Sequence, residues 1–230
     1  MMDQHSLIFR ISIWVVPLLF AVPLHEAAHG WVAHKLGDDT AYLAGRVTFN
    51  PFKHIDLFGT IILPAMLLFA SSGSMAFGFA KPVPVNFRRL RSMRRDMVLV
   101  AIAGPFSNLF LAVASGVLLH TIDWFPETAR AWIGASLFVS MFINMILFFF
   151  NLIPLPPLDG GRVLVAILPP SLAILVSRLE RAGFAIILGG LFLLPWLGDA
   201  VGMDLNIFQW IVGAPARSSL GLIIDLVGLR

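Results

Sequence analysis

The 230-residue sequence contains no cysteine, which excludes disulfide bonds and metal sites built on thiolates. Any bound metal ion would therefore need nitrogen and oxygen ligands. Charge is also scarce: charged residues make up 13% of the chain, whereas they make up about 25% of soluble domains. Hydrophobic residues make up 58% of the chain, against about 45–50% in soluble domains. This composition is typical of a membrane protein, and at this length we expect one membrane domain over residues 1–230.

Long hydrophobic runs define the expected membrane segments. A helix needs about 20 apolar residues to cross the ~30 Å hydrocarbon core. Four runs are long enough or nearly so: residues 7–33, 98–119, 133–153 and 183–198. Two others leave alternatives open. Segment 57–70 is short enough for a tilted or re-entrant helix, and 206–229, interrupted by GAPARSS, forms either two short pieces or one kinked span. We therefore expect an all-α bundle of about five or six membrane segments.

Basic residues raise the isoelectric point to about 10.0, but their placement indicates membrane topology and not a nucleic-acid-binding face. Five arginines precede the 98–119 segment: Arg88, Arg89, Arg91, Arg94 and Arg95. Short cytoplasmic loops are enriched in Lys and Arg, so these arginines are expected in the cytoplasm, beside lipid headgroups. The C-terminal end of the 7–33 segment then faces the cytoplasm too.

The 7–33 segment contains the stretch PLHEAAHGW. His25 and His29 are four residues apart, so they share one face of a helix, with Glu26 about 100° round from His25. H-E-x-x-H on a helix is typical of zinc proteases, in which the histidines bind the metal and the glutamate is the general base. The alternative is a pair of surface histidines. The apolar surroundings favour a metal, because unpaired polar groups at membrane depth cost several kcal/mol.

A catalytic zinc requires a third protein ligand and an open position for water. Asp159, in NLIPLPPLDGGRV, is the strongest candidate, because the prolines end a helix there. Non-helical backbone at membrane depth is tolerated only where it lines a cavity or is buried in protein. Alternatively, Asp159 caps a turn or helix. His54 is a further possible ligand.

The stretch FGFAKPVPVNF is expected to be extended near the cytoplasmic face. Pro82 and Pro84 alternate with valines, a pattern that suits the edge of a sheet. An edge strand could pair with an unwound substrate, and a plain surface loop is the alternative.

Two polar clusters have competing interpretations. His54 and Asp56 could orient a metal ligand, but we favour Asp56 as the N-cap of a helix at 57–70. In AGPFSNLF, Gly104, Ser107 and Asn108 favour close approach of two helices through small residues.

The motifs HEAAH, AGPFSNLF and NLIPLPPLDGG, in this order, resemble those of the site-2 protease family of intramembrane zinc metalloproteases. GRVTFNPFKHIDLFGT and FGFAKPVPVNFRRLR are similar to its short bacterial branch. The resemblance runs from about residue 20 to residue 168. No stretch resembles the PDZ or CBS modules of many relatives, so regulation through such a module is not expected of these residues.

The resemblance implies one zinc ion per chain, bound by His25, His29 and Asp159, with Glu26 as catalytic base. It also implies that Asn151 steadies the substrate or the oxyanion. Without the resemblance, a helix-end or interhelical hydrogen bond accounts for Asn151 equally well.

The predicted function is an intramembrane zinc endopeptidase that hydrolyses peptide bonds in or near transmembrane segments of membrane proteins. We expect it in the bacterial cell membrane, with the active site near the cytoplasmic face. Its partners would be the lipid bilayer and membrane-protein substrates, with no nucleic acid. The alternative is a divalent-metal transporter, which would share the histidines and the aspartate.

Overall fold

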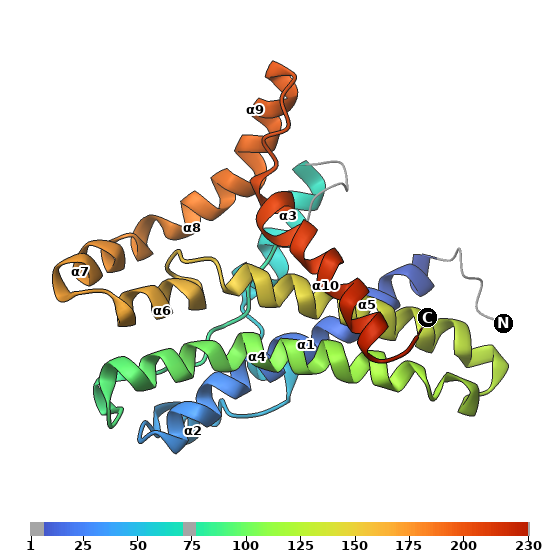
Figure 1. The fold of residues 1–230 in the computed structure, drawn as a ribbon, viewed down its shortest axis with the longest axis horizontal. Coiled ribbons are helices and arrows are strands. Elements are labelled where there is room, and N and C mark those ends of the chain that lie inside the picture. The colour runs from blue at the N-terminus through green and yellow to red at the C-terminus, as the bar shows by residue number, and fades with distance from the viewer. Residues whose placement is uncertain (1–6, 71–76, 230) are drawn as a thin grey trace.

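The computed structural model describes residues 7–70 and 77–229, and these residues form helices joined by loops, with no β-strand among them. Four helices are long and apolar enough to cross a membrane (Figure 1). They are α1 (Leu7–Lys35), α4 (Met93–Leu119), α5 (Glu127–Asn151) and the helix Glu180–Val201. The last comprises α8 (Glu180–Leu188), one turn of π-helix (Gly189–Leu193) and α9 (Leu194–Val201). The four expected segments are thereby confirmed.

The centre of the protein is the packing of α1, α4 and α5 on one another, with α10 (Ala214–Leu226) against α4 and α5 (Figure 1). Small side chains allow this close packing, since Ala112 of α4 and Ala216 of α10 are fully buried in one apolar cluster. Met141 and Met145 of α5 fill the space between them. The candidate site lies at this bundle, because α1 carries two of its residues and α6, which carries the third, packs against α4.

The two ambiguous segments are both helical. Residues 57–70 form a turn of π-helix (Leu57–Ile62) followed by α3 (Leu63–Ala70), too short to cross a membrane. The Asp56 carboxylate accepts a hydrogen bond from the Gly59 amide at 2.7 Å, which confirms it as the N-cap. Residues 207–226 form one continuous helix through GAPARSS, comprising a π-helical turn (Gln209–Gly213) and α10. The alternative of two separate pieces is wrong.

The remaining elements are short. They are α2 (Thr40–Leu43), α6 (Asp159–Ile167), α7 (Pro170–Arg178) and the 3-10 turns Pro51–Lys53, Phe87–Arg89 and Ile122–Trp124.

Residues 77–86 are extended, as expected, but they form no strand. The backbone amides of Phe79 and Lys81 donate to the carbonyls of Gly59 and His54, at 3.0 and 2.9 Å. These acceptors lie in a helical turn and a loop, so no ladder can develop. We call residues 77–86 the extended segment.

Arg46 fixes the middle of the extended segment. Its guanidinium donates from Nη2 to the Lys81 carbonyl at 2.8 Å and to the Pro82 carbonyl at 3.4 Å. Val83 is buried, whereas Pro82 and Pro84 on either side are exposed. The alternation predicted from the sequence is therefore present.

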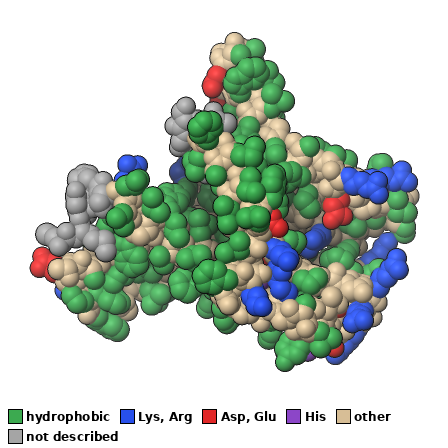
Figure 2. All heavy atoms as spheres, turned by 180° about the vertical axis from the view of Figure 1, so that it is seen from behind, with side chains coloured by type: hydrophobic (Ala, Val, Ile, Leu, Met, Phe, Trp, Pro, Cys, Tyr) green, Lys and Arg blue, Asp and Glu red, His purple; other side chains and the backbone are tan. Residues whose placement is uncertain are grey.

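The surface is mostly hydrophobic, and its positive charge is uneven. Figure 2 shows apolar side chains over most of the face seen from behind, with Lys and Arg gathered mainly at the end that carries α2, α7 and the start of α4. This asymmetry is typical of helical membrane proteins.

Candidate metal centre

The structure brings His25, His29 and Asp159 together, although Asp159 is distant from the histidines in the sequence. The Nε2 atoms of the two rings are 3.0 Å apart, and Asp159 Oδ2 lies 3.2 Å from each of them. All three side chains are buried, and we call these three residues the metal group. Among the residues that the structure describes, this is the only His, Cys, Asp and Glu group with the spacing of a metal site.

The histidines come from one face of α1, and Asp159 is the first residue of α6. The two glycines after Asp159 let the proline-rich loop fold back over the first turn of α6. A Cβ on Gly160 would lie 2.2 Å from the Leu152 carbonyl oxygen, and one on Gly161 would lie 2.1 Å from the Pro156 nitrogen. Both contacts are with backbone, which cannot move aside without moving the loop. The sequence DGG therefore fixes where the aspartate lies.

The outer nitrogens of both rings are hydrogen-bonded. His29 Nδ1 lies 2.7 Å from the Val100 carbonyl oxygen, which can only accept, so this nitrogen donates. His25 Nδ1 lies 2.7 Å from Asn108 Oδ1, again an acceptor. In a neutral imidazole, a proton on Nδ1 leaves a lone pair on Nε2, and both Nε2 atoms face Asp159.

The inner atoms of the group therefore require a cation. Asp159 Oδ2 is buried and accepts no hydrogen bond. Three lone-pair atoms within 3.2 Å repel one another unless a proton or a metal ion lies among them. Two imidazole nitrogens and one carboxylate oxygen are a donor set of catalytic zinc.

Gly104 on α4 leaves space at the ligand atoms. A Cβ on this residue would lie 2.3 Å from His29 Nε2 and 2.6 Å from His25 Nε2. The expected close approach of helices at Gly104 is confirmed, and it takes place at the metal group.

Asn108 lies at the expected helix contact, fully buried, and its amide is in addition a hydrogen-bond partner of His25, which the sequence interpretation did not foresee. Val100, Gly104 and Asn108 follow one another at intervals of four along α4, so they share the face turned toward α1. This spacing is the signal in the sequence that could have linked Asn108 to the histidines.

Glu26 lies beside the extended segment. Its Oε2 accepts a hydrogen bond from the backbone amide of Val83 at 2.7 Å, and the side chain is half-buried. The carboxylate is one residue from His25 yet is not among the three atoms that meet at the centre. The extended segment therefore holds this carboxylate next to the two histidines of α1.

Asn151 and His54 make local contacts. Asn151 Nδ2 donates to the Leu147 carbonyl at 3.0 Å, the bond of a helix end. His54 is buried, with Nε2 3.0 Å from the Thr48 carbonyl oxygen, and it does not belong to the metal group.

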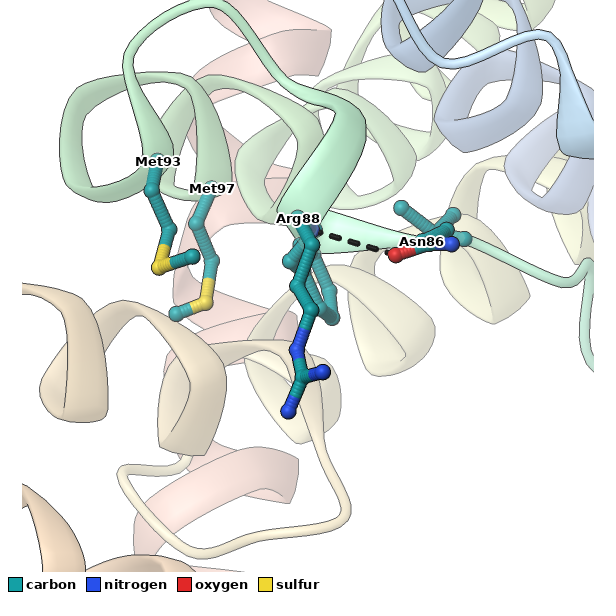
Figure 3. A pocket seen from close by; sticks show the side chains of 6 residues that line it. Asn86, Arg88, Met93 and Met97 are labelled. Atoms are coloured by element: carbon teal, nitrogen blue, oxygen red, sulfur yellow. Dashed lines mark hydrogen bonds between the residues drawn. The ribbon is translucent and has the colours of Figure 1, made fainter.

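A hollow of about 480 Å³ lies beside the extended segment (Figure 3). Its lining residues are Val85, Asn86, Phe87, Arg88, Met93 and Met97. In Figure 3 the side chains of Met93 and Met97, from the start of α4, point into the same space as the Arg88 side chain. The hollow is therefore apolar on the α4 side and follows directly after the part of the segment that contacts Glu26.

Comparison with known proteins identifies the family. The sequence model of Peptidase family M50 matches residues 115–194, which include Asp159. The chain is 43% identical over 178 residues to "Putative zinc metalloprotease YwhC" of Bacillus subtilis, covering 76% of this chain and 77% of that protein.

Two mycobacterial relatives are more distant. "Putative zinc metalloprotease Rip2" of Mycobacterium tuberculosis strain H37Rv is 30% identical over 202 residues, covering 87% of this chain and 71% of that protein. The Mycolicibacterium smegmatis protein of the same name is 29% identical over 170 residues, covering 74% and 62%. No solved structure matches. The geometry of the metal group and the similarity to YwhC agree: this chain belongs to Peptidase family M50, the site-2 proteases, and is a zinc metalloprotease.

Proposed function

We propose that this zinc metalloprotease is an intramembrane endopeptidase that hydrolyses peptide bonds in or near transmembrane segments of membrane proteins. The observation that carries the proposal is the buried group of His25, His29 and Asp159 beside helices long enough to cross a membrane. Buried ionisable groups at membrane depth are costly and are kept for function. One zinc ion per chain, held by these three residues, would offset that cost.

When bound, zinc lowers the pKa of a water ligand to about 7 and polarises a carbonyl. Glu26 takes the proton from the attacking water and then delivers it to the leaving amine. Its hydrogen bond to the Val83 amide holds the carboxylate at the edge of the site, where water and substrate meet. Asn151 steadies the substrate carbonyl after its amide leaves the Leu147 carbonyl.

The extended segment is suited to guide an unwound substrate. A peptide bond in a helix is shielded by its own hydrogen bonds and side chains, so the substrate must open before cleavage. The segment contacts Glu26 through Val83 and exposes Pro82 and Pro84 on its other side. An unwound peptide that lies along it passes the base.

The hollow next to the extended segment suits an apolar side chain of that peptide. Val83 and Val85 share one side of the segment, so the hollow begins two residues from the contact with Glu26. Met93 and Met97 are flexible and polarisable, and they adapt to apolar groups of different shape. Residues from a transmembrane helix are of this kind.

The arginine-rich end supports one orientation in the membrane. Arg178 ends α7, and the arginines at 88–95 lie at the start of α4. Under the bias of short cytoplasmic loops for basic residues, this end faces the cytoplasm of a bacterial cell membrane. The metal group lies toward the C-terminal end of α1, so its access is from the cytoplasmic side.

The test uses the full chain purified in detergent and then reconstituted in vesicles with a membrane-protein substrate. Wild type is expected to hold one zinc per chain and to cleave. Glu26→Gln is expected to hold zinc without cleaving, and Asp159→Ala to lose both. Normal zinc content in Asp159→Ala would contradict the ligand set, and metal flux in place of cleavage would indicate a transporter.

A further inference from the structure

Two buried asparagines lie behind His25, away from the metal group. Asn108 of α4 is 0% exposed and Asn144 of α5 is 1% exposed. Asn108 Nδ2 donates to Asn144 Oδ1 at 2.8 Å, and Asn144 Nδ2 donates to the Ser140 carbonyl at 2.9 Å. With the bond from His25 Nδ1 to Asn108 Oδ1, these groups form a continuous chain from α5 through α4 to α1.

The direction of this chain is set at its far end. The Ser140 carbonyl is a backbone acceptor, so Asn144 must turn its NH₂ group toward it and its oxygen toward Asn108. Asn108 must then turn its NH₂ group toward Asn144 and its oxygen toward His25. An oxygen facing Nδ1 requires the proton on Nδ1, which leaves Nε2 free to bind a metal.

The reversed amide of Asn108 would have the opposite effect. Its NH₂ group would then donate to His25 Nδ1 and move the ring proton to Nε2, where the metal must bind. Apart from Asn144, the Asn108 NH₂ group contacts the Ala21 carbonyl at 3.5 Å, the limit of hydrogen-bond length. Asn144 is therefore the strong contact that prevents the reversal.

We propose that Asn144 is a positioning residue for the metal centre: through Asn108 it selects the tautomer of His25 that binds the metal, although it touches none of the three ligands. The inference rests on the proposed zinc site. Hydrogen-bond partners of metal-bound histidines set ring orientation and tautomer, and their loss typically costs about 10- to 100-fold in metal affinity.

The experiment measures zinc affinity of the full chain in detergent, by competition with a chelator, for three variants. Asn144→Leu keeps the approximate side-chain volume but removes both hydrogen bonds, and is expected to weaken zinc binding about 10- to 100-fold. Asn108→Asp places a carboxylate next to His25 Nδ1. A carboxylate has no N–H to present, so the double variant Asn108→Asp with Asn144→Leu is expected to recover most of the lost affinity.

The double variant separates tautomer selection from packing. A packing defect left by leucine would persist in the double variant, so failure of the rescue would overturn the inference, as would unchanged affinity in Asn144→Leu. Ser115→Ala is the matched control, because Ser115 Oγ contacts Ser140 Oγ at 2.8 Å and bonds neither asparagine directly, while the stronger bond of Asn144 to the Ser140 carbonyl at 2.9 Å remains. It is expected to bind zinc normally, and a loss equal to that of Asn144→Leu would also count against the proposal.

Asp159→Ala distinguishes this inference from the proposed function. Wild-type affinity in Asp159→Ala would mean that the zinc site itself is wrong. Loss of zinc in Asp159→Ala together with normal affinity in Asn144→Leu would reject the role of Asn144 alone.

Discussion

Replacing Gly104 with alanine adds one methyl group at the place where the ligand atoms meet. The added Cβ would lie 2.3 Å from His29 Nε2 and 2.6 Å from His25 Nε2. Nonbonded heavy atoms normally stay about 3.5 Å apart or more, so the ring or the helix must move by about 1.2 Å. Metal–ligand distances tolerate only about 0.2 Å, so the two nitrogens can no longer serve one ion.

The rings cannot give way freely, because each is held at Nδ1. A displacement of that size stretches the 2.7 Å bond from His29 to the Val100 carbonyl beyond hydrogen-bond length. We expect Gly104→Ala to lower zinc affinity by more than about 100-fold, the upper end of the losses seen when only a supporting contact is removed. The helix itself should persist, because alanine favours helix over glycine by about 1 kcal/mol.

The assay is zinc content and chelator competition on detergent-purified protein, with helix content measured by circular dichroism. Gly116→Ala is the matched control on the same helix. Its Cβ would lie 3.3 Å from side-chain atoms of Ile223 and Met141, which can shift by a few tenths of an ångström. This variant should bind zinc normally. Wild-type zinc affinity in Gly104→Ala would refute the placement of the metal between these nitrogens.

Three further outcomes are expected. Gly161→Ala should destabilise the fold by about 1–3 kcal/mol, because its Cβ would lie 2.1 Å from the Pro156 nitrogen. Gly221→Ala, with open space around its Cβ, should leave the thermal midpoint unchanged, and equal midpoints for both variants would contradict the close loop contact. Replacing Pro82 and Pro84 together with alanine should slow cleavage of a membrane substrate while zinc content stays normal; unchanged cleavage would remove the extended segment from substrate handling. Chelation should lower the thermal midpoint of wild type, because a ligand that binds only the folded state stabilises it, and leave Asp159→Ala unaffected; an equal drop in both would show that the chelator acts elsewhere.

Features that depend on neighbouring residues could be predicted from the sequence. The four spans follow from local apolar runs, and the shared face of His25 and His29 follows from helical spacing. Asp159 is an exception, because it lies far from the histidines in the sequence. It could still be named as a candidate ligand, since a proline-broken stretch at membrane depth must line a cavity or be buried in protein. The N-cap Asp56 is equally local.

Features that depend on packing between distant segments could not be predicted. Asn108 reads as a helix-packing residue until α4 is placed against α1, when its amide reaches His25. The extended segment has the composition of an edge strand, but its amides find a helical turn and a loop as partners. In 207–226 the stretch GAPARSS predicts a break, yet the helix continues through Pro215, which directly follows the π-helical turn Gln209–Gly213.

Helix α4 contacts the metal group at three successive turns. Val100 provides a carbonyl acceptor for His29, Gly104 leaves space for the ligand nitrogens, and Asn108 provides an oriented amide for His25. If α4 slid by one residue, all three would be lost at once, since their neighbours offer other shapes and groups. The colour of cobalt substituted for zinc would therefore report how α4 is seated against α1. Spectra recorded in bilayers of different thickness would therefore show whether bilayer thickness shifts α4 relative to α1.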